Sequence, residues 1–385
     1  MRALVHRWGA YTEEDVIHYL NKMNIQTVVI IHPLSDKNHD ELFEKKLKET
    51  IRSGDFDFVF SVNYFPVIAK ASHECNLKYV SWSYDAPLNV INIEETLGLS
   101  SNIVYMFDKV QVEGYREKGF DNVYHLPLAV PFERYDAVRL TASDTRKYSS
   151  DISFVGNLYS DILGSYISPL DDYDKGYIEA VCSAQQQLYG AYIIDNNISD
   201  ELIERINNKY REIKPDTDIV MSREALSYAM ASYTTRKERL SILGVLSKKC
   251  DLKYYSGEEN AILSGARFGG KVDYRTDMPK VFKASGVNLN ITLKILQSGI
   301  PLRALDIMGC EGFLLSNYQP ELTEYFEDEK DIVMYTSMED AVSKAIYYAS
   351  NKDKANKIAL SGYEKVKRRF SYQDRLSRII SDISK

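Results

Sequence analysis

The 385-residue sequence contains few cysteines. Its four cysteines are far apart and form no Cys-x-x-Cys pair: Cys75, Cys182, Cys250 and Cys310. Neither a disulfide framework nor a zinc site is therefore predicted, and a reducing, cytoplasmic compartment is the simplest interpretation. The net charge is −7, whereas a general nucleic-acid-binding protein would be basic.

Long apolar runs are also absent from the sequence. No stretch approaches the ~20 consecutive apolar residues that a membrane-spanning helix needs. The first residues, MRALVHRWGAY, form a short apolar run that enters a glycine turn, which is not typical of a signal peptide. We expect a cytoplasmic protein, and contact with a membrane surface stays open.

Tyrosine, by contrast, is abundant, with 29 residues against 2 tryptophans. Tyrosine side chains offer amphipathic surface for interfaces or for stacking against sugars, although the source's composition explains their number equally well. At 385 residues the chain is too long for one ordinary hydrophobic core, so two domains are expected.

The first part of the chain alternates between strand-like and helix-like segments. Residues 12–23 predict a helix with Thr12 as its N-cap, and residues 39–54 predict an amphipathic helix that ends at Gly54. Such alternation is typical of βαβ units around a parallel sheet with helices on both faces. The predicted strands are 2–8, 26–32, 56–63, 77–85, 103–109 and 122–130, and the further helices are 65–76 and 112–120.

The second part resumes this rhythm around two irregular segments. Residues 131–150 are polar and are interpreted as an inter-domain linker, and residues from about 161 to 233 predict a helical insertion. The fold class is therefore α/β, with two doubly wound domains. The predicted strands are 151–160, 250–257, 270–274, 286–292, 313–316 and 331–337, and the predicted helices are 234–249, 276–285, 302–309, 338–351, 352–370 and 372–384.

A glycine–proline loop before the predicted helix 302–309 has the character of an anion site. A helix N-terminus exposes free N–H groups and a partial positive charge, and diphosphate is a common ligand there. Arg303 adds a donor for phosphate, and Asp306, three residues on, could accept both hydroxyls of a ribose. A solvated Arg303–Asp306 pair is the competing interpretation. The loop residues whose main chain would line the site are Ser298, Gly299, Ile300, Pro301 and Leu302.

Several segments, taken together and in this order, resemble the CgeB-like (spore maturation type) glycosyltransferases, which are similar to the retaining group 1 nucleotide-sugar transferases of GT-B fold. The resemblance covers most of the chain outside the helical insertion. It implies two Rossmann-like domains that face a central cleft. The segments are YVSWSYDAPLN (79–89), residues 105–130, SFVGNLYS (153–160), residues 272–292 and residues 298–375.

The resemblance also implies that the two domains bind different substrates. An acceptor-side domain is expected over residues 1–145, and a nucleotide-sugar-binding domain over residues 146–370. Residues 371–385 are expected to form a helix that crosses back to the first domain. Asp306 matches the acidic position that holds the donor ribose. The related first acidic position falls on Ser298, so this contact to the donor sugar departs from the family pattern.

Further residues of the second domain are implied in donor binding. Gly156 and Asn157 match the glycine turn that faces the phosphates. Arg236 and Arg239 are candidates for the basic residue that offsets the diphosphate charge, although surface helix residues are more often solvated. Asn288, Asn290 and Thr292 alternate along one strand and suggest a site wall. Tyr254, Tyr255 and Tyr274 resemble the donor-base pocket, and core aromatics beside a sheet are an equally good interpretation.

In the first domain, Asp85 follows a predicted strand and is the candidate for a catalytic or acceptor-orienting carboxylate, with a helix N-cap role beside Pro87 as the alternative. Arg303 is the second catalytic candidate, because a leaving diphosphate needs charge stabilisation. No metal site is predicted: the Asp-x-Asp motifs at 55–57 and 172–174 lie before a strand and in a polar loop, respectively. No role is predicted for His6 or His125.

The predicted function is transfer of a hexose from a nucleotide-diphosphate sugar, most simply a UDP-sugar, to an acceptor hydroxyl, with retention and without a metal or other cofactor. The acceptor is a glycan, a lipid-linked glycan or a protein. The alternatives are a sugar-nucleotide epimerase on the same fold and a non-catalytic sugar-nucleotide-binding protein. A homodimer through the helical insertion and peripheral membrane contact stay open.

Overall fold

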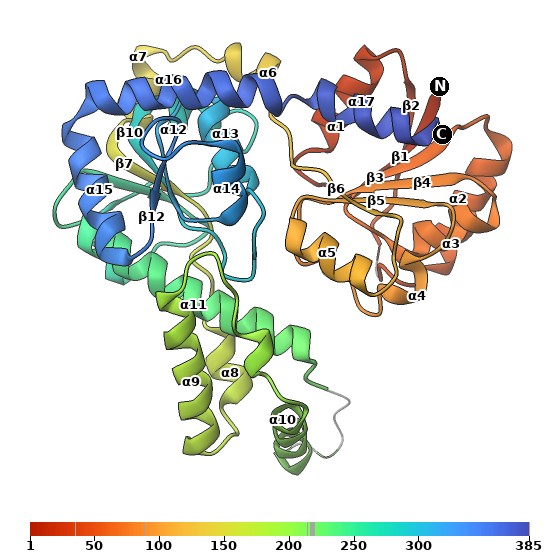
Figure 1. The fold of residues 1–385 in the computed structure, drawn as a ribbon, viewed down its shortest axis with the longest axis horizontal. Coiled ribbons are helices and arrows are strands. Elements are labelled where there is room, and N and C mark those ends of the chain that lie inside the picture. Colours follow the sequence, from red (N-terminus) through yellow and green to blue (C-terminus); the bar gives the residue numbers. More distant parts are fainter. Residues whose placement is uncertain (35, 89, 214, 216–219, 385) are drawn as a thin grey trace. The chain divides into compact units, whose positions relative to one another are not determined.

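The computed structural model describes residues 1–34, 36–88, 90–213, 215 and 220–384. It divides the chain into two compact units, drawn in Figure 1. Unit 1 comprises Met1–Arg134, Gly299–Leu305 and Val366–Lys385, and unit 2 comprises Tyr135–Ser298 and Asp306–Lys365. Each unit is built around its own parallel β-sheet.

The sheet of unit 1 has six parallel strands in the order β2-β1-β3-β4-β5-β6. The chain winds outward in both directions from β1 and β3, so the switch in strand order lies between these two strands. Their side chains are almost all buried, as expected for a parallel sheet covered on both faces. The strands are β1 (Arg2–Arg7), β2 (Gln26–Ile31), β3 (Phe58–Val62), β4 (Lys78–Trp82), β5 (Asn102–Met106) and β6 (Val123–His125).

The helices of unit 1 begin where the sequence offers caps. Asp40 accepts the Phe43 N–H and starts α2, and Asp108 accepts the Gln111 N–H and starts α5. Thr12 precedes α1 but makes no side-chain cap bond. The helices are α1 (Glu13–Lys22), α2 (Glu41–Ser53), α3 (Pro66–Glu74), α4 (Glu94–Leu97) and α5 (Lys109–Glu117).

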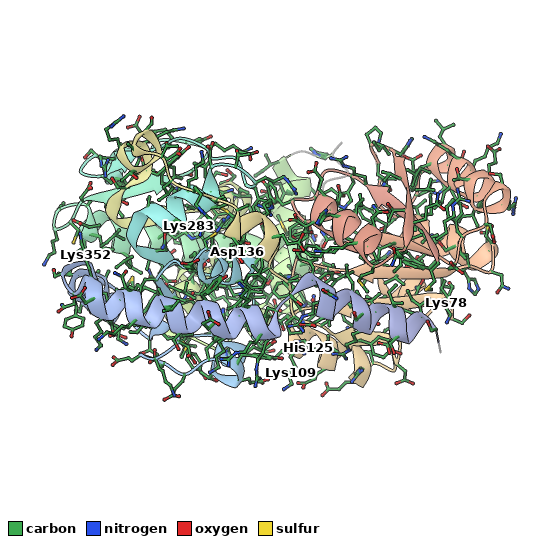
Figure 2. The ribbon with its side chains drawn as sticks, turned by 90° about the horizontal axis from the view of Figure 1, so that it is seen from above. Lys78, Lys109, His125, Asp136, Lys283 and Lys352 are labelled. Carbon is green, nitrogen blue, oxygen red and sulfur yellow. The ribbon has the colours of Figure 1, made fainter. Side chains whose placement is uncertain are left out.

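The C-terminal helix α17 (Tyr372–Ile383) belongs to unit 1. Tyr372 stacks on Tyr19 of α1 with ring centroids 5.1 Å apart, and its ring meets Trp82 of β4 edge-on. At the far end of the helix, the Lys78 ammonium group, labelled in Figure 2, donates to the carbonyl of Ile383. A cation at a helix C-terminus is favourable because the last carbonyls lack partners.

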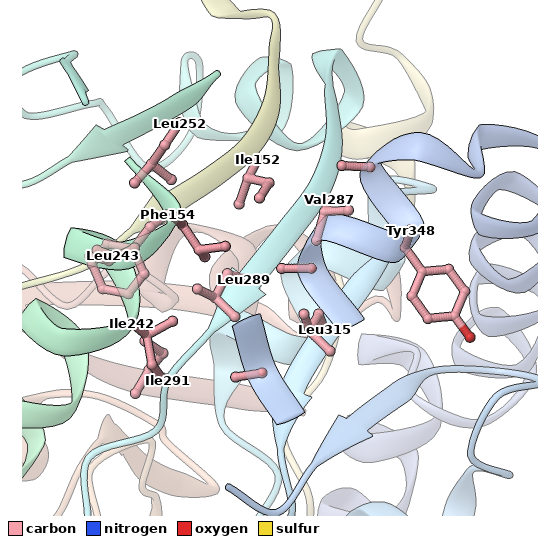
Figure 3. Close-up of a cluster of buried hydrophobic side chains, with 14 of the residues drawn as sticks. Ile152, Phe154, Ile242, Leu243, Leu252, Val287, Leu289, Ile291, Leu315 and Tyr348 are labelled. Carbon is pink, nitrogen blue, oxygen red and sulfur yellow. The ribbon is translucent and has the colours of Figure 1, made fainter. Parts of the chain in front are cut away.

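The sheet of unit 2 also has six parallel strands, in the order β12-β11-β10-β7-β8-β9. Counted within the unit this is the Rossmann order 3-2-1-4-5-6, with the switch between β7 and β10. Alternate residues of these strands, among them Ile152, Val287 and Leu289, form one apolar core (Figure 3). The strands are β7 (Ser150–Val155), β8 (Leu252–Tyr255), β9 (Arg267–Phe268), β10 (Ser285–Asn290), β11 (Leu314–Asn317) and β12 (Val333–Tyr335).

Four helices between β7 and β8 form the insertion and have a core of their own, which includes Ile178, Ile206 and Leu226. They are α8 (Ile162–Ile167), α9 (Asp172–Gln187), α10 (Asp200–Ile213) and α11 (Arg223–Leu246), and Figure 1 shows them gathered together. Only α11 continues onto the sheet of unit 2, where Leu243 and Leu246 join the core. The other helices are α12 (Met278–Ala284), α13 (Leu302–Gly309), α14 (Pro320–Tyr325), α15 (Met338–Ser350) and α16 (Lys352–Arg369).

One local prediction is wrong. Residues 270–274 form no strand, because Gly270 has φ +72° and turns the chain away after the short strand β9 at Arg267–Phe268. The segment 131–150 contains the first boundary between the two units, at Arg134 and Tyr135, and also forms α6 (Phe132–Asp136) and α7 (Ala142–Tyr148). The start of α7 is fixed by a capping box between Thr141 and Asp144, a signal that is visible in the sequence.

Candidate functional site

The carboxyl edge of the unit 2 sheet gathers buried polar side chains at the switch between β7 and β10. The Asn290 amide at the end of β10 is 5 % exposed and donates to the hydroxyls of Thr292 (3.1 Å) and Ser316 (2.9 Å). Asn317, at the end of β11, accepts the Thr292 N–H at 2.8 Å. Asn290 and Thr292 therefore lie together at this edge, while Asn288 binds Ser153 and the Phe282 carbonyl deeper in the sheet.

Two arginines of α11 reach the same edge. Arg239 is buried and donates to the carbonyls of Asn157 and Ile291, which follow β7 and β10. Arg236 is half-buried and donates to the Tyr159 carbonyl at 2.5 Å. Within the part of the chain that the structure describes, neither arginine forms an ion pair.

The nearest acid on the helix does not neutralise these arginines. Glu238 lies beside Arg239 in sequence but pairs with Lys294 (3.0 Å) and accepts the Tyr189 hydroxyl (2.8 Å). All three side chains are largely buried, so Glu238 and Lys294 compensate each other. The two guanidinium groups therefore leave a net positive charge at the switch point of unit 2.

The glycine turn after β7 lies where the sequence predicted it, and its two residues differ in exposure. Gly156 is half-buried and donates its N–H to the Tyr255 carbonyl at 3.0 Å, and Asn157 is exposed. The Asn157 side chain accepts the N–H of Tyr159, whose φ is +55°. The structure thus brings Gly156, Asn157, Arg236 and Arg239 together.

Asp306 on α13 is 1 % exposed, so it is no solvated helix residue. Its Oδ1 accepts the hydroxyls of Tyr135 (2.7 Å) and Tyr274 (3.2 Å). Tyr274 therefore lies beside the predicted ribose-binding residue. Tyr255 lies elsewhere, at the end of β8: it is 3 % exposed, and burial raises the pKa of its hydroxyl well above the usual value.

Ser298, where the family pattern places an acid, has a carboxylate as its neighbour. The Ser298 hydroxyl donates to Glu321 Oε1 at 2.8 Å, and the Glu321 N–H donates back to the Ser298 carbonyl at 3.1 Å. Glu321 is fully buried in the first turn of α14. A carboxyl group thus lies beside Ser298, but it comes from a different segment of the chain.

The loop before α13 is packed more tightly than the sequence suggests. The Gly299 N–H donates to the Asp108 carboxylate at 3.2 Å, and a Cβ on Gly299 would lie 2.9 Å from the Phe107 ring. Glycine is thus required here for close packing within unit 1. Ile300 is 1 % exposed, while Pro301 and Arg303 are half-buried.

Leu302, the first residue of α13, lines a cavity of about 10 Å³ in unit 1. This volume holds about one water molecule, so no substrate fits into it. The remaining lining residues are Thr12, Trp82, Tyr84, Leu128, Ala129 and Tyr372.

Asp85 belongs to unit 1 and lies after β4. Its Oδ2 accepts the Asn63 side-chain amide at 2.7 Å, and Asn63 Oδ1 accepts the N–H groups of Tyr84 (3.0 Å) and Asp85 (3.3 Å). Burial raises the pKa of Asp85, while the Asn63 hydrogen bond lowers it by less. A carboxylate fixed in this way is suited to orienting a hydroxyl group.

Sequence reasoning missed Glu321, Tyr135, Asn317 and Asn63. Tyr135 and Glu321 are far from their partners in sequence, so no local pattern identifies them. Asn63 directly follows an apolar strand and has φ +65°, a conformation that asparagine tolerates, and it was a detectable signal.

The described residues contain no group of three or more His, Cys, Asp or Glu side chains that could hold a metal ion. No helix among them is both long and apolar enough to cross a membrane.

The two sheets with their flanking helices define a GT-B fold. A glycosyltransferase from Rickettsia africae matches 99 % of this chain with 97 % of its own (TM-score 0.55, 11 % identity). Anabaena HepE, solved in complex with UDP-glucose, matches 100 % with 99 % of its own (TM-score 0.54, 11 % identity). A putative UDP-N-acetylglucosamine 2-epimerase from Listeria monocytogenes matches 99 % with 95 % of its own (TM-score 0.53, 12 % identity).

At sequence level, residues 223–381 match a protein-family model described as glycosyl transferase-like. The matched segment contains α11, the strands β8 to β12 and α13, and therefore includes Arg236, Arg239 and Asp306. A comparison with curated proteins gives no significant match.

Proposed function

We propose that this chain is a glycosyltransferase that moves a hexose from a UDP-sugar to an acceptor hydroxyl, with retention of the anomeric configuration and without a metal. The acceptor is a glycan, a lipid-linked glycan or a protein. The narrower kinship with CgeB-like transferases, a cytoplasmic location, peripheral membrane contact and a homodimer through the insertion belong to the same proposal.

In the proposed reaction, the bond between the anomeric carbon and the diphosphate oxygen breaks, and UDP leaves with the bonding electrons. The acceptor oxygen then bonds to the anomeric carbon, and its proton passes to the released diphosphate. Fixed positive charge near the diphosphate would lower the barrier, because negative charge develops on it. Arg236 and Arg239 are the groups of unit 2 assigned to this role, while Arg303 stays an expectation from the sequence, because the nearby Gly299 N–H already donates to the Asp108 carboxylate.

The observation that carries the proposal is the pair of guanidinium groups at the switch point of unit 2. Arg236 and Arg239 are anchored to main-chain carbonyls, and neither is neutralised within the described residues. A fixed cationic pair at the carboxyl edge of a Rossmann-ordered sheet fits a diphosphate. Asn290, Thr292 and Asp306 offer polar groups for the sugar and ribose hydroxyls. Gly156, Asn157, Tyr274 and Ser298 complete the assigned donor contacts within unit 2.

An epimerase on the same fold is the second candidate, because one structural match bears that description. The buried Ser298–Glu321 pair, which stands in place of the family acid, motivates a third candidate, a protein that binds the nucleotide sugar without turnover.

Calorimetry with UDP, GDP, ADP and dTDP tests the shared part of these candidates, and we expect UDP to bind. Release of UDP from UDP-glucose, UDP-galactose and UDP-N-acetylglucosamine should then increase when candidate acceptors are added, with or without EDTA. Epimerised sugar formed without an acceptor would favour the second candidate, and binding without turnover the third. The absence of binding by every nucleoside diphosphate would contradict all three.

A further inference from the structure

The carboxyl edge of the unit 1 sheet carries a second cluster, at the switch between β1 and β3. Trp8 follows β1, Asn63 follows β3, and Tyr84 with Asp85 follows β4. Since the carboxyl ends of parallel strands meet at one edge, these four residues come together there. The N–H groups of Tyr84 and Asp85 both donate to Asn63 Oδ1, and the Trp8 ring lies against the Tyr84 ring, which confirms that the four residues are close together.

This edge is not built for a phosphate. The N–H groups of Trp8 (2.8 Å) and Gly9 (3.1 Å), which point out of the turn after β1, both donate to the carboxylate of Glu13. Glu13 is 1 % exposed, and its carboxylate, with Arg7 at 3.8 Å, already occupies the place in this turn where a phosphate would accept the two N–H groups. A ligand that adds negative charge here would be repelled.

The two aromatic side chains at this edge, Trp8 and Tyr84, are both half-buried. Their rings are nearly parallel, at 11°, with centroids 6.5 Å apart. Trp8 is fixed because its indole N–H donates to the Val62 carbonyl at 2.8 Å and its ring packs edge-on against Phe65. A rigid aromatic surface of this kind loses little entropy on binding and suits the C–H face of a sugar ring.

Asp85 adds the polar part of the cluster. One carboxylate oxygen accepts the Asn63 amide, and no described residue donates to the other. Asn63 is itself 4 % exposed and holds the backbone of the same turn, so Asp85 cannot swing freely. A half-buried carboxylate with one open oxygen is suited to accepting hydrogen bonds from sugar hydroxyls.

We propose that Trp8, Tyr84 and Asp85 form a carbohydrate-binding site for the acceptor, with a sugar ring stacked on the aromatic pair and a hydroxyl held by Asp85. The site rests on the proposed function, because it makes a sugar the acceptor of the transfer. Asn63 acts as a positioning residue for Asp85. The acceptor is thus a glycan or the headgroup of a glycolipid, and the sugar that binds at this site is uncharged.

The test is direct binding of the intact protein to an array of immobilised neutral saccharides, with and without UDP. We expect at least one saccharide to bind, with at least a tenfold loss of affinity in Trp8→Ala and in Asp85→Asn, and partial recovery in Trp8→Phe. Tyr173→Ala, which removes a 79 % exposed tyrosine of α9, is the matched control and should bind as the wild type does.

A second measurement covers the case in which Trp8→Ala unfolds. The chain has two tryptophans, and Trp82 is 4 % exposed, so a Trp82→Phe variant reports on Trp8 alone. The saccharide should change Trp8 fluorescence in that variant. No saccharide bound, or unchanged affinity in folded Asp85→Asn, would overturn the site.

Calorimetry with UDP separates the two proposals. UDP binding without any saccharide binding would remove the acceptor site and keep the proposed function. Saccharide binding without nucleotide binding would remove the transfer reaction.

Discussion

The two units share a parallel six-stranded sheet with a switch in strand order, yet the turn after the first strand differs between them. In unit 1 the turn after β1 gives two N–H groups to Glu13. In unit 2 the turn after β7 meets Arg236 and Arg239, which have no carboxylate partner among the described residues. Two parallel α/β sheets of different strand order thus present an edge already occupied by a carboxylate in unit 1 and a cationic edge in unit 2.

The largest effect is expected at Asp306, which belongs to unit 2, the unit with the cationic edge. Asp306→Ala should weaken UDP binding by about 100-fold, because two charge-assisted hydrogen bonds to ribose are worth roughly 3 kcal/mol. Calorimetry measures the affinity, and a thermal melt shows whether the buried site still folds. Tyr274→Phe removes one hydrogen bond to the same carboxylate and should have a small effect. Equal UDP affinity in folded Asp306→Ala would place the ribose elsewhere.

The second test removes the carboxylate that accepts the N–H groups of the turn after β1 in unit 1. Glu13→Ala should lower the free energy of unfolding by about 2 kcal/mol, because the Trp8 and Gly9 N–H groups lose their buried acceptor. Inorganic phosphate should restore part of the melting temperature of this variant and leave the wild type unchanged. Glu14→Ala is the matched control, since Glu14 is 46 % exposed and pairs with Arg7 at the surface. Equal stability of the two variants would refute the role of Glu13.

The third test removes one of the two arginine charges at the carboxyl edge of the unit 2 sheet. Arg236→Gln should reduce UDP affinity about tenfold, which corresponds to roughly 1.4 kcal/mol for one charge-assisted contact. Lys237→Gln is the control on the same helix, because Lys237 is already paired with Glu179 at 2.5 Å. If both variants lose affinity equally, the effect comes from net charge and not from the position of Arg236.

The smallest expected effect is a loss of stability of unit 1 at low pH. All six histidines lie in unit 1, and His6 is fully buried between the rings of Phe43 and Phe65. Burial lowers the pKa of His6 to about 4, so the unfolded chain binds more protons below pH 6.5. Stability contributed by neutral His6 is therefore complete above pH 6.5 and falls as the pH drops towards 4.

Between pH 7 and 5.5 this loss should be about 1 kcal/mol. Hydrogen exchange resolved by unit should show amide protection falling in unit 1 and not in unit 2. His6→Leu should flatten the pH dependence of unit 1. A loss of equal size in both units would show that His6 is not its origin.

The sequence was sufficient for the architecture because the signals are local. Alternating apolar segments with caps such as Asp40 predicted the strands and helices, and the polar insertion was recognisable by its lack of strand-like segments. Where local signals are weak the predictions were less accurate: the two-residue strand β9 was misplaced, and the short helices α6 and α7 within the predicted linker were not predicted. The predicted residues Gly156, Asn157, Arg236, Arg239 and Asn290 do meet at one edge of unit 2.

By itself, then, the sequence determined the two doubly wound sheets and the positions of their strand ends, since periodicity and caps act over a few residues. Only the tertiary structure decided that Glu13 accepts the N–H groups of one turn, while Arg236 and Arg239, which have no carboxylate partner among the described residues, border the other. It also decided that Glu321 lies against Ser298 and that Tyr135 and Tyr274 hold Asp306. These contacts join residues far apart in the chain, and their energies depend on burial, which no local pattern encodes.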